Sequence, residues 1–153
     1  MIFLWLVFYL VYLFCFAFIV PRATVKRYAA TPRDWQHRLA HVLFYSIPAS
    51  YFLGVDQPPP SVALLSFVLF AGGGALAIWA VVSNPWFSPA IEMPPMVVTD
   101  GAFLLVNHPF YCGAGLMAIA GWLMVGHALA IIPLAAYLLL LTWRGWRESK
   151  MLR

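Results

Sequence analysis

The chain has 153 residues, of which 64% are hydrophobic and only 9% charged, with a mean hydropathy of +0.87 and a net charge of +4. Because soluble domains carry about 25% charged residues, this composition excludes an ordinary water-soluble domain. Uncharged runs of about 16–22 residues recur, close to the length that a helix needs to cross a hydrocarbon core of about 30 Å. The sequence therefore predicts an all-α, integral membrane helical bundle that forms a single membrane domain over residues 1–153.

Five apolar segments are predicted to be transmembrane helices. The first starts after Met1 and ends before Pro21. It lacks the basic start and the small-residue cleavage site of a signal peptide, so we expect a retained helix. The last two segments are short, and little more than Gly126 and His127 separates them, which predicts a tight helical hairpin. The expected spans are about residues 2–20, 39–55, 62–83, 109–125 and 128–143.

The third expected span contains the run "AGGGALA" at residues 71–77. Small side chains let the backbones of two membrane helices approach closely. We therefore expect these glycines to mark a helix contact, and a ligand pressed against them is the alternative.

The basic residues predict the orientation of the bundle, because Lys and Arg concentrate in the cytosolic loops of membrane proteins. All nine fall into two groups that five spans place on the same side, so the N-terminus is predicted outside and the C-terminus in the cytosol. Since these residues flank membrane helices, they indicate topology and contact with anionic lipid, and no nucleic-acid partner is expected. The groups are Arg22, Lys26, Arg27, Arg33 and Arg38, and then Arg144, Arg147, Lys150 and Arg153.

The segment 84–108, between the third and fourth expected spans, differs from the rest of the chain. Its prolines make it too broken for a span, and it is too apolar for a solvated linker. Irregular backbone at a membrane must be satisfied by protein or by a water-filled cavity. We expect this cytosolic segment to form the wall or lid of a pocket, and the alternative is a loop that lies in the interface.

The run "VNHPFYCG" at residues 106–113 opens the fourth span with a cluster of polar groups. Pro109 suits the first position of a helix, and Asn107 or His108 can cap it. The free backbone N–H groups of such a helix start attract an anion such as a carboxylate.

The predicted hairpin returns the segment "RGWRES", residues 144–149, to the same cytosolic face. Arg144 or Arg147 can grip a carboxylate with two hydrogen bonds, and Glu148 can hold an ammonium group or ribose hydroxyls. The two segments together predict a site for a polar, zwitterionic ligand at the membrane edge. Taken singly, the arginines also suit membrane anchors, Glu148 suits a partner for Arg144, and His108 suits a helix cap.

Other candidate ligands are weaker. Cys15 and Cys112 form no CxxC pair, which indicates neither a disulfide framework nor a zinc site. His37 and His41 have a spacing that can share a metal ion, but no third ligand is in view, so no metal site is expected.

These segments resemble the family of membrane methyltransferases that includes isoprenylcysteine carboxyl methyltransferase and the phospholipid methyltransferases. The family pattern runs valine-threonine-x-glycine-proline-tyrosine, then arginine-histidine-proline-x-tyrosine-x-glycine, and here it reads "VTDGAF" at 98–103 and "NHPFYCG" at 107–113. The family later shows an arginine, then two glutamates four and five positions on, then a leucine, and here these positions are Arg144, Glu148, Ser149 and Leu152. Upstream, "NPWFS" at 84–88 resembles the family's stretch of asparagine, tryptophan, phenylalanine and serine after the preceding span.

The resemblance covers about residues 79–153 and has clear departures. Asn107 stands where the family has arginine, Ala102 and Phe103 replace proline and tyrosine, and Ser149 replaces the second glutamate. The family also continues past the position of Arg153 into an aromatic tail.

The resemblance implies an S-adenosylmethionine-dependent methyltransferase that acts on a hydrophobic or lipid acceptor from the bilayer, most simply a carboxylate. It implies catalytic roles for Arg144 and Glu148, and cofactor binding by Gly101, His108, Pro109, Tyr111, Gly113 and Glu148. The alternative is a non-catalytic membrane scaffold or ligand-binding relative of the same fold. A transporter subunit is a weaker alternative, because no internal repeat or charge within a span is found. The oligomeric state stays open.

Overall fold

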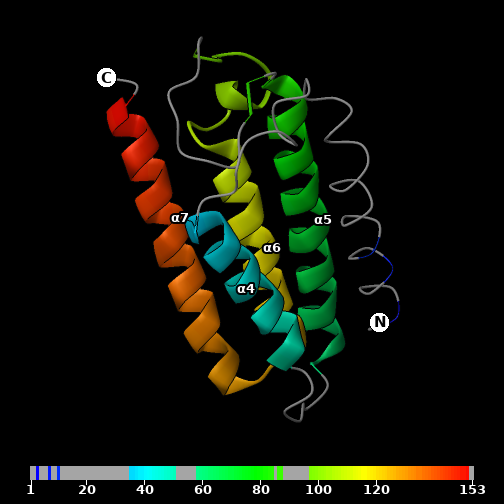
Figure 1. The fold of residues 1–153 in the computed structure, drawn as a ribbon. Helices are drawn as coiled ribbons and strands as arrows, with labels where there is room; N and C mark the ends of the chain where they lie inside the picture. Colours follow the sequence, from blue (N-terminus) through cyan, green and yellow to red (C-terminus); the bar gives the residue numbers. More distant parts are fainter. Residues whose placement is uncertain are drawn as a thin grey trace.

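The computed structural model describes residues 3, 7, 10, 35–50, 58–84, 86–87 and 97–151, and the regular elements in these ranges are all helices (Figure 1). The predicted all-α class is confirmed for this part of the chain. The elements are the α-helices α4 (Trp35–Ala49), α5 (Pro60–Ser83), α6 (Pro109–Val125) and α7 (Ile131–Met151), and the 3-10 helices η3 (Gly101–Leu104) and η4 (Ala128–Ala130).

Successive α-helices run in opposite directions, so they share two ends (Figure 1). The C-terminal ends of α5 and α7 and the N-terminal end of α6 lie at the same end of the bundle, which we call the upper end. Helix α6 packs on α5 along one side and on α7 along the other, and α4 crosses in front and contacts both α6 and α7. Segments more than 40 residues apart in sequence, such as the residues around His108 and those around Ser149, meet at the upper end.

Two helical segments, Pro60–Ser83 and Ala128–Met151, are long and apolar enough to cross a membrane by length and composition. At 1.5 Å per residue each is about 36 Å long, against a hydrocarbon core of about 30 Å. Helix α6 is apolar but shorter, and its bounds agree with the expected span at 109–125. Most of the first expected span lies outside the described residues, as does the end of the second, so the expected number of five spans stays a prediction.

Two helices extend beyond the expected spans, and the bounds of the spans themselves stay a prediction. Helix α7, which contains most of the span expected at 128–143, continues through the charged residues to Met151, because no proline follows Trp143 and basic residues suit the negative end of a helix. Helix α4, which contains the start of the span expected at 39–55, begins at Trp35, since polar residues at a helix start can face water without ending the helix. Charge therefore marks where an apolar surface ends rather than where a helix ends.

The predicted tight hairpin between α6 and α7 is confirmed. Gly126 ends α6 in the left-handed conformation, with φ of 67°, and its N–H donates to the carbonyl of Trp122. Glycine adopts this conformation at little steric cost, which makes it the usual residue after a helix end. The imidazole of His127 then accepts a hydrogen bond from the N–H of Leu129 and starts η4.

The expected glycine contact is confirmed at α5 and α6. A Cβ atom added to Gly73 would lie 2.6 Å from the carbonyl oxygen of Gly113, and one added to Gly113 would lie 2.7 Å from the backbone nitrogen of Ala77. Below this crossing, the buried hydroxyl of Ser66 donates to the carbonyl of Ala120 over 2.7 Å. The two backbones thus touch without intervening side chains, and this contact holds α6 against α5.

We predict that Gly73→Ala lowers the free energy of unfolding by about 1–3 kcal/mol, the usual cost of overpacking a close contact. The added methyl group would meet backbone atoms, which cannot rotate away as a side chain can. The matched control is Gly72→Ala, because a Cβ atom there has nothing within 4 Å. Denaturant titration in detergent micelles measures both, and equal stability of the two variants would contradict the prediction.

Candidate functional site

Polar side chains from α7 and from the start of α6 form one connected network at the upper end of the bundle. The hydroxyl of Tyr111 donates to Oε1 of Glu148, and Oε2 of the same carboxylate lies 3.5 Å from Nδ1 of His108. Nε of Arg144 donates to the Tyr111 hydroxyl oxygen over 3.4 Å. Tyr111 therefore bridges the guanidinium group and the carboxylate, and both oxygens of Glu148 face α6.

His108 is held at both ring nitrogens by consecutive residues of α7. Nε2 lies 2.7 Å from the hydroxyl oxygen of Ser149, while Nδ1 faces Glu148. The side chains of His108 and Glu148 are 24% and 29% exposed, so solvent or a ligand can reach the pair. The expectation that the two segments of the hairpin meet is confirmed by these contacts.

The local sequence explains how α6 presents its residues. Pro109 is buried at the first helical position, where its missing N–H leaves no hydrogen bond unmade. His108 occupies the N-cap position, as predicted, but its side chain makes no capping hydrogen bond. The imidazole instead turns toward α7, which leaves the first backbone N–H groups of α6 without a side-chain cap.

Helical spacing explains how α7 presents its residues. Arg144 and Glu148 are four positions apart, so they lie on the same face of the helix. Gly145 lies between them, and a Cβ atom there would sit 3.5 Å from both the His108 and Tyr111 rings. Arg144 is only 4% exposed, which is unusual for arginine and places its charge inside the bundle.

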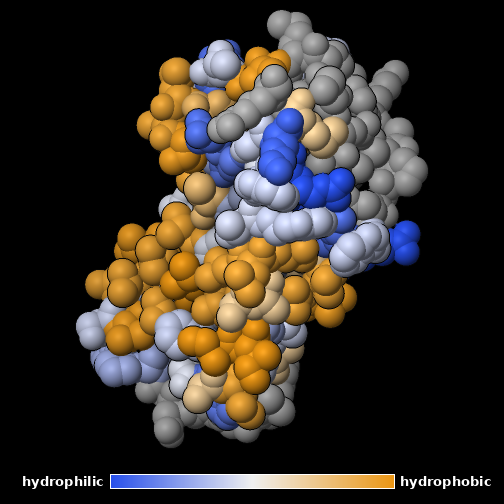
Figure 2. Space-filling model, turned by 90° about the vertical axis from the view of Figure 1, so that its left-hand side faces the viewer, coloured by the Kyte–Doolittle hydropathy of each residue, from blue (hydrophilic) through white to orange (hydrophobic). Residues whose placement is uncertain are grey.

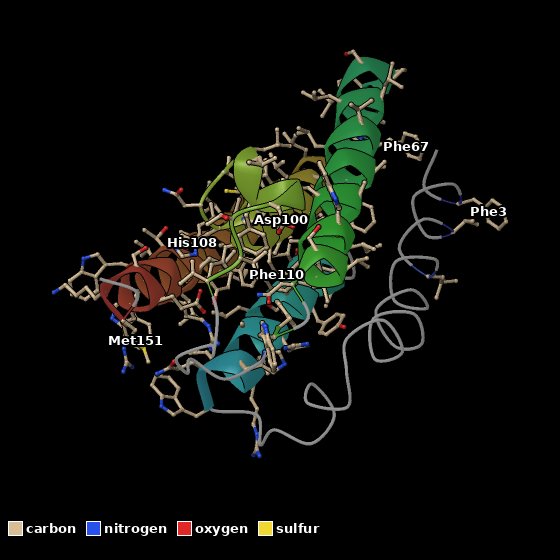
Figure 3. All side chains as sticks on the ribbon, turned by 90° about the horizontal axis from the view of Figure 1, so that it is seen from above. Phe3, Phe67, Asp100, His108, Phe110 and Met151 are labelled. Carbon is tan, nitrogen blue, oxygen red and sulfur yellow. The ribbon has the colours of Figure 1, made fainter. Side chains whose placement is uncertain are left out.

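The segment "NPWFS" reaches the same end of the bundle from α5. The side-chain oxygen of Asn84 accepts from the N–H of Trp86 over 2.9 Å and turns the chain after α5. Phe87 then packs edge-on against Phe110, with ring centroids 5.0 Å apart. Seen from the upper end (Figure 3), Phe110 lies toward α5 and His108 toward α7, so neighbouring residues of α6 serve different contacts.

Two predicted cofactor-binding residues make packing contacts outside this network. Gly113 lies in the crossing with α5, as described above. Gly101 has φ of 57° and starts η3, and a Cβ atom there would collide with the side chain of Ser83. Both glycines are needed for close packing on α5, and a part in cofactor binding stays a prediction for them.

The segment expected to wall a pocket is described only at its two ends. Residues 88–96 lie outside the described part of the chain. In residues 97–107, η3 packs on α5 through Ala102, which is completely buried. Its role as the wall or lid of a pocket therefore stays a prediction.

Sequence reasoning missed the roles of Gly145 and Ser149. Ser149 counted as a departure from the family pattern, yet its hydroxyl contacts His108 in the position where the family has a carboxylate. The available signal was its place next to Glu148 on the same helix. Gly145 gave no signal in the sequence, because the need for a small residue there arises from the rings of His108 and Tyr111 that pack against it.

The weaker candidate ligands that the structure describes are not part of this network. Within the described ranges, no group of three or more His, Cys, Asp and Glu residues could hold a metal ion. Nδ1 of His41 lies 2.8 Å from the carbonyl oxygen of His37, so the pair makes a helix-internal contact. Cys112 is exposed as a free thiol, and Cys15 lies outside the described residues.

No protein-family model matches the chain, and neither a curated protein nor a solved structure matches it. The resemblance to the membrane methyltransferases is therefore carried by the motif residues alone. Of these, the structure gathers His108, Tyr111, Arg144 and Glu148 into one network.

We predict that Tyr111 and Glu148 are energetically coupled. A double-mutant cycle with Tyr111→Phe and Glu148→Gln should give a coupling free energy of about 1 kcal/mol, because each change removes one partner of the same hydrogen bond. Denaturant titration in detergent micelles measures the four proteins. The control cycle pairs Tyr111→Phe with Lys150→Gln, an exposed residue of α7, and should be additive within about 0.5 kcal/mol. Equal coupling in the two cycles would refute the contact.

Proposed function

We propose that the chain is an integral membrane methyltransferase that uses S-adenosylmethionine and acts on a hydrophobic or lipid acceptor, most simply a carboxylate. The observation that carries the proposal is the contact of His108 with Glu148, which joins the start of α6 to the end of α7. Tyr111 and Arg144 complete the network from the same two helices. The family resemblance implies cofactor binding for His108, Tyr111 and Glu148 and catalytic roles for Arg144 and Glu148.

The chemistry of these side chains fits S-adenosylmethionine. Its carboxylate matches the uncapped N–H groups at the start of α6, where the helix dipole is positive. Its ammonium group or ribose hydroxyls match the carboxylate of Glu148. The partly exposed His108 and Glu148 are the members of the network that a water-soluble ligand can reach.

When bound, the cofactor supplies a methyl group on a positively charged sulfur. The chain's part is to align the acceptor atom with that carbon and to exclude water. A carboxylate acceptor needs no general base, and a site of low dielectric favours the union of opposite charges over their separate hydration. An amine acceptor would have to lose a proton, and Glu148 or His108 would receive it.

The helical bundle supports an arrangement in which the two substrates arrive by different routes. The two long apolar helices fit a bilayer, and the polar network lies at one end of the bundle. Arg147 and Lys150 lie near the C-terminal end of α7, at this same end, which the positive-inside rule assigns to the cytosol. The cofactor would enter from the cytosol and an apolar acceptor from the bilayer, with the N-terminus outside.

A second function, a non-catalytic ligand-binding or scaffold relative, is favoured by one observation. Both oxygens of Glu148 and both ring nitrogens of His108 already face partners within the chain. A network that is satisfied internally gains less from a ligand, since each new hydrogen bond replaces an existing one. Ligand binding and methyl transfer separate the two functions.

We predict that the purified protein binds S-adenosylmethionine or its demethylated product, measured by calorimetry in detergent. His108→Ala and Glu148→Ala should each weaken binding at least about tenfold, the effect of losing one charge-assisted hydrogen bond. His127→Ala is the matched control, because this histidine lies at the opposite end of the bundle. A folded protein without binding would refute the enzyme and favour the scaffold.

We predict that Arg144→Lys lowers the rate of methyl transfer at least about tenfold while changing cofactor affinity less than about threefold. Lysine keeps the charge but lacks the planar guanidinium group that donates to Tyr111. Transfer of a labelled methyl group to an S-prenylated cysteine with a free carboxylate measures the rate. Arg147→Lys, on the exposed face of α7, should leave the rate unchanged, and equal losses in both variants would contradict a catalytic role for Arg144.

A further inference from the structure

The last two turns of α7 have two faces of different chemistry. Arg144, Glu148 and Ser149 face α6 and belong to the network described above. The opposite face presents aromatic and basic side chains, and the aromatic ones are exposed despite their size. These residues are Trp143 (37% exposed), Trp146 (54% exposed), Arg147 and Lys150.

On this outer face each basic side chain lies over an aromatic ring. The guanidinium carbon of Arg147 is 5.1 Å from the ring centroid of Trp143, and Nζ of Lys150 is 3.9 Å from that of Trp146. Contacts within about 6 Å are attractive, since the face of an indole ring is electron-rich. The rings therefore hold two flexible cations side by side at the end of one helix.

Toward the C-terminus of α7, the side chains of its outer face change from apolar to aromatic to basic, which is the order expected where a helix leaves a membrane. Leu139 is 71% exposed in the apolar part of the helix, the two tryptophans follow, and the cations come last. From Trp143 to Lys150 the helix rises about 10 Å, close to the depth of roughly 5–8 Å of one headgroup layer. From the side of α7, hydrophilic residues gather above a broad hydrophobic surface (Figure 2).

The outer cations face no carboxylate of their own chain in the ranges that the structure describes. The acidic residues there are Asp100 and Glu148. Glu148 points inward to Tyr111 and His108, and Asp100 lies in the segment before η3. Among the described residues, the positive charge of this face is therefore not neutralised by a carboxylate.

We propose that the outer face of α7 formed by Trp143, Trp146, Arg147 and Lys150 binds the headgroup of an anionic phospholipid. The phosphate lies between the two cations, and the tryptophans lie at the level of the glycerol backbone and the first acyl carbons. Tryptophan and basic residues in this order are typical of the membrane interface, and basic residues attract anionic lipid. The site stands whether or not the inner face is an enzyme site.

The test uses the full chain in non-ionic detergent micelles doped with phosphatidylglycerol or phosphatidylcholine brominated near the headgroup, which quenches tryptophan fluorescence on contact. We expect phosphatidylglycerol to quench at a lower mole fraction than phosphatidylcholine. Arg147→Gln and Lys150→Gln should each raise the half-quenching fraction about fivefold, from the usual attraction of one basic residue to anionic lipid. Trp143→Phe/Trp146→Phe should remove the anion-specific quenching.

Two controls separate this site from a general attraction by positive charge. Arg38→Gln removes one charge from α4 instead of α7 and should leave the half-quenching fraction unchanged. Arg147→Lys/Lys150→Arg keeps both charges and should retain binding. Excess inorganic phosphate should not compete, because the lipid also contacts the tryptophans. Equal quenching by both lipids, an equal effect of Arg38→Gln, or full competition by phosphate would overturn the proposal.

Discussion

The carboxylate of Glu148 is the group on which the upper end of the bundle depends. One oxygen accepts from Tyr111 and the other faces His108, so a single side chain of α7 fixes two side chains of α6. Hydrogen bonds to a charged group are roughly twice as strong as those between neutral groups. The hairpin brings the two helices together, but this carboxylate sets their register at the end where Arg144 is buried.

The network in turn needs a fixed α6, and α5 supplies it. Because Gly73 and Gly113 bring the two backbones into contact, α6 can neither slide nor rotate without a steric clash. The first turn of α6 lies just above this crossing and carries His108 and Tyr111 toward α7. Helix α5 thus fixes the positions of His108 and Tyr111 indirectly, through its contact with α6.

Helix α7 shows how one short segment can serve two environments. Its inner face joins a polar network, and its outer face carries the sequence of apolar, aromatic and basic side chains that suits a bilayer surface. The division follows from helical periodicity, since residues 144 and 148 share one face and residues 143, 147 and 150 share another. Polar chemistry and lipid contact can therefore occur within one helical turn of each other.

The sequence by itself determined the helical class, the hairpin at Gly126 and Pro109 as the start of α6, because each depends on local preference or composition. It also determined that the segments around His108 and Glu148 meet, since two antiparallel helices of similar length must return to the same end. Only the tertiary structure decided that Ser149 and Gly145 belong with His108, and that Gly113 packs on α5. These contacts depend on how the helices are rotated about their axes, and that rotation is set by packing between distant residues rather than by any local pattern.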